Sequence, residues 1–173
     1  AEQKLQKTLE EYETVFQSTQ EAMFLVEVVQ GTEFRYIRNN RAHQRLTGFY
    51  SQNFRGKTPH ELLDQELGNI VASNYRSCVQ ASCPISYEET LDLPAGRRTW
   101  HTNLTPVFQE GRIAFIVGSC RDITQRKALE EDLLRRTEEQ AVLLDCVPTQ
   151  LWYLIDPDTY GAVNQAHADF LGL

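Results

Sequence analysis

Long apolar runs, paired-cysteine motifs and clustered basic residues are all missing from this sequence. No run approaches the roughly 18 apolar residues that cross a bilayer, and no secretory signal is present, so neither a membrane span nor direct membrane contact is expected. The formal net charge of −7 argues against a nucleic-acid partner, because phosphate binding requires clustered Lys and Arg. These absences leave a soluble globular domain.

The cysteines do not predict a metal site. Cys78, Cys83, Cys120 and Cys146 lie at irregular spacings, none belongs to a CxxC motif, and no histidine stands beside them at ligand spacing. We expect reduced and mostly buried thiols in a cytoplasmic protein. Any membrane anchor would then belong to another part of a longer chain.

The first 18 residues predict a flanking amphipathic helix. Apolar residues recur in steps of 4, 3 and 4 on an otherwise charged segment, at Leu5, Leu9, Tyr12 and Phe16. Such a narrow stripe is typical of a coiled-coil seam or of a helix laid on a sheet. We expect this helix to join two copies of the chain in a homodimer.

The patterns that follow predict an α+β fold. Two strand-like runs come first, then a group of helical segments, then three more strands separated by glycine-containing turns. The predicted strands are 22–29, 33–39, 85–93, 98–108 and 112–122, and the predicted helices are 40–48, 58–63 and 66–82. Because short connections favour hairpins, we expect one five-stranded antiparallel sheet with helices on one face.

A charged segment without Gly or Pro follows the last strand and predicts a linker helix over 125–147. Leu129, Leu133, Leu143 and Val147 fall at heptad-like steps, but polar residues interrupt the stripe. The pattern fits a weak parallel seam that extends the dimer, and it fits a plain spacer helix equally well.

An internal repeat divides the chain. The run NRAHQRLTG (40–48) returns as NQAHADFLG (164–172), and AMFLV (22–26) is echoed by QLWYL (150–154). The tail 148–173 is therefore expected to be the truncated start of a second copy of the domain at 19–124. Since the chain starts without Met and stops within this pattern, we expect a piece of a longer protein.

Two motifs resemble those of PAS sensor domains, the S-box/PAC family of bacterial signalling proteins. One is the joint VGSCRDITQRK (117–127), and the other is the helix with Asn-Arg-Ala at 40–42 and Leu-Thr-Gly at 46–48. The resemblance covers residues 10–127 and, for the first third of a second copy, 144–173. It implies an input module of a sensor histidine kinase, a cyclic-di-GMP enzyme or a transcriptional regulator, whose output domain is not visible here.

The resemblance also implies that the joint relays a signal. Asp122 and Thr124 carry oxygens suited to cap the exposed amides of a helix that starts near Gln125. An acid at this place is also favoured by the helix dipole. A purely structural cap is the alternative.

Strand alternation and the family's geometry together place a candidate ligand pocket on the inner face of the sheet. A buried acid in the strand 85–93 needs a partner or a polar ligand. The alternative for Glu89 is pairing with an Arg or a place at the rim of the pocket. A glycine in the last strand leaves room for a ligand or only eases helix packing. The candidate pocket residues are Glu89, Trp100, Thr102, Leu104, Ile116 and Gly118.

Cofactor motifs of similar proteins are absent. Haem-binding members should carry a His on the helix 66–82, which has none, and photoreceptor members need a flavin-reactive Cys in the region 48–63, which has none. Non-covalent binding of a flavin remains an alternative that only Trp100 supports. His43 and His167 recur on the repeated helix, where we expect packing or surface capping.

No nucleophile–base pair, metal set or phosphate loop indicates an enzyme. The sequence therefore predicts a non-catalytic sensory module that binds an unknown small molecule and transmits through its linker helix. The alternative is a ligand-free scaffold for dimerisation or protein interaction.

Overall fold

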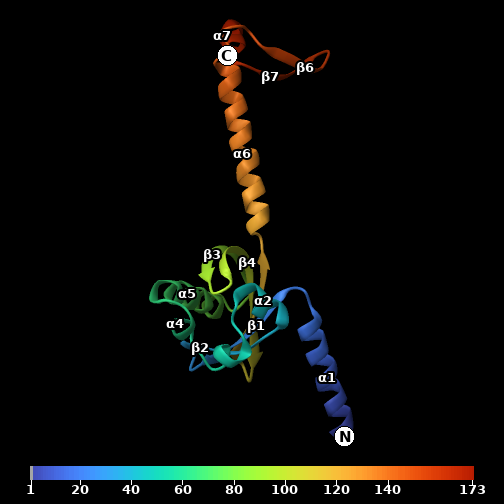
Figure 1. Ribbon diagram of the computed structural model, residues 1–173, viewed down its shortest axis with the longest axis vertical. Coiled ribbons are helices and arrows are strands. Elements are labelled where there is room, and N and C mark those ends of the chain that lie inside the picture. Colours follow the sequence, from blue (N-terminus) through green and yellow to red (C-terminus); the bar gives the residue numbers. More distant parts are fainter. Residues whose placement is uncertain (1) are drawn as a thin grey trace. The chain divides into compact units, whose positions relative to one another are not determined.

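The computed structural model describes residues 2–173, except for the side chains of Glu2 and Leu5, so the predicted dimer contact of Leu5 lies outside the described residues. The chain forms two compact units that divide after Thr124 (Figure 1). The first holds α1 (Glu2–Ser18), β1 (Ala22–Val29), β2 (Glu33–Asn39), α2 (Arg41–Thr47), α3 (Ser51–Phe54), α4 (Pro59–Leu62), α5 (Gln65–Ala81), β3 (Ile85–Leu93), β4 (Gly96–Gln109) and β5 (Arg112–Asp122). The second consists of α6 (Thr124–Asp145), β6 (Trp152–Asp156), β7 (Thr159–Val163) and α7 (Gln165–Leu171).

The predicted five-stranded antiparallel sheet is confirmed, in the order β2-β1-β5-β4-β3. Two of its hairpins turn at Gln30-Gly31 and Glu110-Gly111, where all four residues have positive φ. This left-handed pair matches the twist of the flanking strands, and between β4 and β5 it forms the preferred two-residue hairpin loop. The pairing of β1 with β5 joins the first hairpin to the three later strands and brings Ala22 opposite Cys120.

The core lies between the inner face of the sheet and the helices α2 to α5. Strand alternation buries Phe24, Val26, Trp100, Leu104 and Ile116 in one layer. The long helix α5 packs on β3 and β4 and supplies Val71, Tyr75 and Cys78 to the same cluster. The inner face is thus covered by helices, as predicted.

One short helix was not predicted. The helix α3 has only four residues, and no side chain caps its N-terminus at Tyr50. It lies against β2 and buries Phe54 completely. Tertiary packing therefore forms this turn of helix, because its local sequence carries no helix signal.

The C-terminal half of α1 is attached to β2 and α2. The Arg38 guanidinium lies 4.3 Å from the centroid of the Phe16 ring and forms an ion pair with Glu13. The backbone amide of Arg41 donates to Gln17 Oε1 at 3.0 Å. These contacts hold α1 beside the sheet of the first unit.

In the second unit, β6 and β7 form a two-stranded hairpin that is followed by α7. The helix α6 has no buried residue, and it ends at Asp145 rather than at 147, because Pro148 disfavours helical backbone in the residue before it. Among the described residues, no helix has both the length and the apolarity needed to cross a membrane.

Candidate ligand cavity and relay joint

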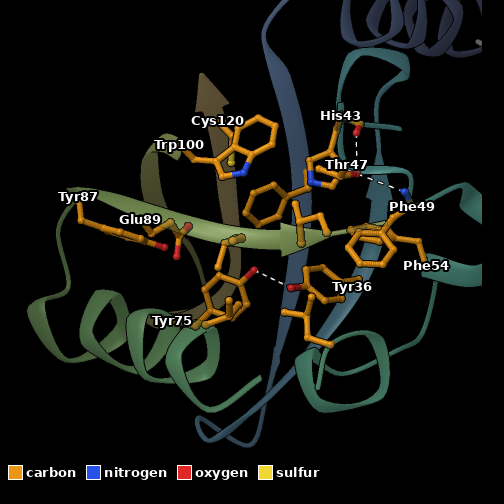
Figure 2. Close-up of a pocket in the computed structure, with 15 residues that line it drawn as sticks. Tyr36, His43, Thr47, Phe49, Phe54, Tyr75, Tyr87, Glu89, Trp100 and Cys120 are labelled. Carbon is orange, nitrogen blue, oxygen red and sulfur yellow. Dashed lines mark hydrogen bonds between the residues drawn. The ribbon is translucent and has the colours of Figure 1, made fainter. Parts of the chain in front are cut away.

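A cavity of about 50 Å³ lies inside the first unit, between the inner face of the sheet and the helices (Figure 2). Its walls are mostly aromatic and aliphatic, with a few polar groups. The lining residues are Phe24, Tyr36, His43, Thr47, Phe49, Phe54, Leu63, Val71, Tyr75, Tyr87, Glu89, Leu91, Leu93, Trp100 and Cys120.

Aromatic rings fill most of the space around this cavity. The hydroxyls of Tyr36 and Tyr75 lie 2.9 Å apart, and burial raises the pKa of both side chains above the usual tyrosine value. The Tyr36 ring also packs on Phe54, with centroids 4.4 Å apart. These contacts indicate a largely pre-formed wall.

Glu89 is the acid of the cavity. Its Oε1 accepts a hydrogen bond from Thr102 Oγ1 at 3.0 Å, and its Oε2 accepts one from Asn74 Nδ2 at 3.4 Å. Burial raises the pKa of this carboxyl, and the hydrogen bond from Thr102 offsets only part of that rise. The partner of Glu89 is therefore polar and uncharged, and the carboxyl keeps lone pairs for a further donor.

The structure divides the predicted pocket residues into three groups. Glu89 and Trp100 line the cavity, and Thr102 lies outside the lining and donates a hydrogen bond to Glu89. Leu104 and Ile116 are completely buried core residues outside the lining. Gly118 faces the ring of Phe24, which occupies the space that a side chain at Gly118 would need.

Sequence reasoning missed His43 as a lining residue. It is buried against the rings of Phe24 and Phe54, and burial lowers the pKa of its imidazole to about 3. The packing role that we expected is therefore present, but the side chain also faces the cavity. The only signal in the sequence was the recurrence of this His in the repeat.

Cys120 also lines the cavity without having been predicted. Burial raises the pKa of its thiol to about 12, so the thiol stays protonated and unreactive at neutral pH. Among the described residues, no three His, Cys, Asp or Glu side chains gather closely enough to hold a metal ion.

The joint between β5 and α6 is tied to β4. Asp122 Oδ1 accepts hydrogen bonds from the backbone N–H and the hydroxyl of Thr124, at 3.0 and 2.6 Å, and Oδ2 forms an ion pair with Arg98. Burial raises the pKa of Asp122, but these hydrogen bonds and the Arg98 charge outweigh it, so its pKa lies below the usual value.

Thr124 also binds to β4. Its Oγ1 accepts a hydrogen bond from the backbone N–H of Thr99 at 2.9 Å. The Thr99 carbonyl in turn accepts from the Ile123 N–H at 2.8 Å. The reason is spatial, because β4 runs beside the end of β5 and offers unpaired backbone groups there.

A second, larger hollow of about 740 Å³ lies on the other face of the sheet, along α1. Three predicted dimer residues line it, namely Leu9, Tyr12 and Phe16, together with Val15, Leu25 and Val117. Leu9 and Tyr12 are 58% and 71% exposed, whereas Phe16 is partly covered by Arg38. Among the described residues of this stripe, Leu9 and Tyr12 therefore stay exposed within one chain, and only Phe16 is partly covered.

Comparison with known proteins gives the class of this molecule. Residues 16–128 match the family described as PAS fold, and the chain belongs to that family. Members of this family are typically sensory and not catalytic, so the first unit is a sensory PAS domain. None of the curated proteins matches this sequence.

Solved structures share the fold at low identity. An RNA-binding light-oxygen-voltage receptor has 18% identity and a TM-score of 0.63, over 76% of this chain and 37% of that one, so this chain spans well under half of that receptor. A PAS domain from Colwellia psychrerythraea has 19% identity and a TM-score of 0.57, over 68% of this chain and 98% of that one. The PAS domain of Bordetella pertussis BvgS has 20% identity and a TM-score of 0.55, over 77% of this chain and 98% of that one.

Light-oxygen-voltage proteins among these neighbours raise the question of flavin. The cavity of about 50 Å³ is smaller than the roughly 150 Å³ that accommodates a single benzene ring. A tricyclic isoalloxazine would therefore have to displace several of the packed rings, among them Phe24 and Trp100. In this conformation the lining residues do not fit a flavin.

Proposed function

We propose that the first unit is an input domain that binds a small molecule in the inner cavity and transmits its occupancy to α6. The observation that carries this proposal is the position of Trp100. It lines the cavity, and it is the register partner of Asp122 across β4 and β5. One residue earlier, Thr99 makes both backbone hydrogen bonds to the start of the linker.

The transmission route is short and physically continuous. A ligand that moves the Trp100 indole would shift the backbone of β4 at Thr99. That shift would strain the hydrogen bonds to Ile123 and Thr124, because their length and angle depend on the position of β4. The start of α6 would then respond, as in other switches where small displacements bias a two-state element.

The same route gives the experiment. In Trp100→Phe the amides of Ile123 and of the first turn of α6 should exchange hydrogen at a changed rate, and in the matched variant His101→Ala, whose side chain lies on the opposite face of β4, they should not. Unchanged exchange at these amides in Trp100→Phe, with the fold intact by circular dichroism, would refute the route.

For the complete protein we propose a cytoplasmic signalling chain of bacterial type, with a sensor histidine kinase or a cyclic-di-GMP enzyme as its output. Two features support this context. The joint 117–127 resembles the corresponding motif of PAS sensor domains, and α6 is solvated with exposed apolar residues at Leu129, Leu133 and Leu143, which suits transmission along the chain. The proposal would fail if the natural gene encoded no output domain after this segment.

We further propose that the tail is the start of a second PAS copy. Asn40 Oδ1 accepts from the amides of Met23 and His43, and Asn164 Oδ1 accepts from those of Leu151 and His167. Both helices end at a left-handed glycine, Gly48 and Gly172. The shared hydrogen-bond pattern supports common ancestry of the two segments beyond the sequence match.

We also propose a homodimer through α1. Leu9 and Tyr12 are exposed beside an apolar hollow of the same unit. The exposed apolar side chains of α1 from a second copy of this chain would fill that hollow. Along α1, Lys4 and Lys7 lie N-terminal to Glu10. Two antiparallel α1 helices would pair these opposite charges in a closed two-fold interface.

A further inference from the structure

The hydrogen bonds around His43 determine which of its ring nitrogens carries the proton. Asn39 Nδ2 donates to the Phe49 carbonyl at 2.8 Å, which fixes the orientation of that amide. The same Nδ2 lies 3.0 Å from His43 Nδ1, so Nδ1 must accept. The Thr47 hydroxyl lies 3.3 Å from Nδ1, but it donates its hydrogen to the His43 carbonyl oxygen at 2.6 Å. The imidazole is therefore the neutral tautomer with its hydrogen on Nε2.

Nε2–H is thus a donor on the ring edge opposite to Asn39, and it takes part in none of the hydrogen bonds of the described residues. Trp100 adds a second such donor. Its Nε1 is buried and has no hydrogen-bond partner in the described part of the chain, although the side chain is only 1% exposed. A buried N–H without an acceptor costs about 1–3 kcal/mol, so its persistence calls for a partner.

Both donors belong to the lining of the same cavity, which they reach from α2 and β4 (Figure 2). The Glu89 carboxyl, which also lines the cavity, accepts one hydrogen bond at each oxygen and has lone pairs left for further donors. No Lys or Arg is among the lining residues. An anion would therefore meet a carboxyl and no cation, and burying such a charge unpaired is costly.

We propose that this cavity binds a small uncharged amide- or urea-type molecule, whose carbonyl oxygen accepts from His43 Nε2–H and Trp100 Nε1–H and whose N–H donates to Glu89. The two lone pairs of a carbonyl oxygen suit two donors. A cavity of about 50 Å³ selects a molecule smaller than benzene. This assignment deepens the proposed input function and rests on it for its biological meaning.

Acetamide is the probe, because it is small and neutral and carries both groups. In a ¹⁵N-labelled sample of the whole chain, the two indole N–H signals belong to Trp100 and Trp152, and Trp152→Phe assigns them. We expect acetamide to shift the Trp100 signal in a saturable manner, while acetate at equal concentration leaves it in place. The His43 nitrogen shifts should show the Nε2–H tautomer both before and after addition.

Two variants complete the test. In Glu89→Ala, which keeps both N–H donors, acetamide should bind at least tenfold more weakly, while His101→Gln on the outer face should bind as the natural chain does. An unmoved Trp100 signal, an equal response to acetate, an Nδ1–H tautomer, or a flavin released from the purified protein would each overturn the proposal. Because the hydrogen-exchange test of the β4 route uses no ligand, either proposal can fail while the other stands.

Discussion

The ring of Phe24 lies on top of Gly118, its register partner across β1 and β5. A Cβ atom at Gly118 would lie 2.0 Å from Phe24 Cζ, much closer than van der Waals contact allows. The glycine therefore does not open the cavity for a ligand. It makes room for a ring that is itself part of the cavity wall.

Gly118→Ala should consequently destabilise the first unit. Phe24 is enclosed by Tyr36, His43 and Tyr75 and cannot move without displacing them. Overpacking of this kind costs about 1–3 kcal/mol, which urea unfolding would measure. The double variant with Phe24→Leu should regain part of the loss, and Ser119→Ala, on the other face, should have little effect. Equal stability of Gly118→Ala and the natural chain would contradict the packing described.

Asn40 should be among the most sensitive polar residues of the first unit. Its side chain is fully buried and bonds to the Met23 and His43 amides and to the Glu21 carbonyl. Asn40→Ala leaves these groups unpaired, so we expect a loss of about 2–3 kcal/mol in the free energy of unfolding. The exposed Asn53→Ala is the control and should change it by less than about 0.5 kcal/mol. A loss at Asn40 no larger than at Asn53 would contradict the assignment.

Removing the Thr124 hydroxyl should loosen the joint. In Thr124→Val, Thr99 N–H loses its acceptor and Asp122 loses one donor, so the Thr99 amide should exchange with solvent faster. The expected cost is about 1 kcal/mol, that of a neutral hydrogen bond. Thr124→Ser keeps the hydroxyl and should restore slow exchange. Protection of Thr99 that is the same in both variants would show that the hydrogen bond contributes nothing.

Acid should weaken the first unit through His43. The pKa of its imidazole falls from 6.5 to about 3 on folding, so below pH 6.5 the unfolded chain holds a proton that the folded chain does not. Stability is then lost as the pH falls, by about 2 kcal/mol between pH 7 and pH 5 from this group alone. In His43→Gln the pH dependence of urea unfolding should be smaller by that amount, and in His101→Gln it should be retained.

The α1 interface predicts a change of oligomeric state. Leu9→Glu and Tyr12→Glu place a charge in the apolar stripe and should convert the dimer to monomer in sedimentation equilibrium, without loss of the fold. Gln80→Glu, which adds the same charge at an exposed position of α5, should leave the dimer intact. A natural chain that is monomeric at high concentration would rule out the α1 dimer.

Much of the fold was readable from local sequence. The predicted strands 22–29, 33–39, 85–93 and 112–122 match β1, β2, β3 and β5 to the residue. Period-two alternation and left-handed Gly turns are local properties, so they can be predicted from neighbouring residues in the sequence. The inner face of β4 was predicted for the same reason, since Trp100, Thr102 and Leu104 are all buried.

Only the tertiary structure decided what the inner face contains and where the joint is anchored. Alternation says that Trp100 points inward, but not that its N–H lacks an acceptor or that His43, from a helix 57 positions away, shares its cavity. The residue type at the joint suggests that Thr124 is a cap. It does not show that β4 lies near enough for the Thr99 N–H to donate a hydrogen bond to the Thr124 hydroxyl. Periodicity specifies directions along one element, whereas distances between elements depend on how all the side chains pack together.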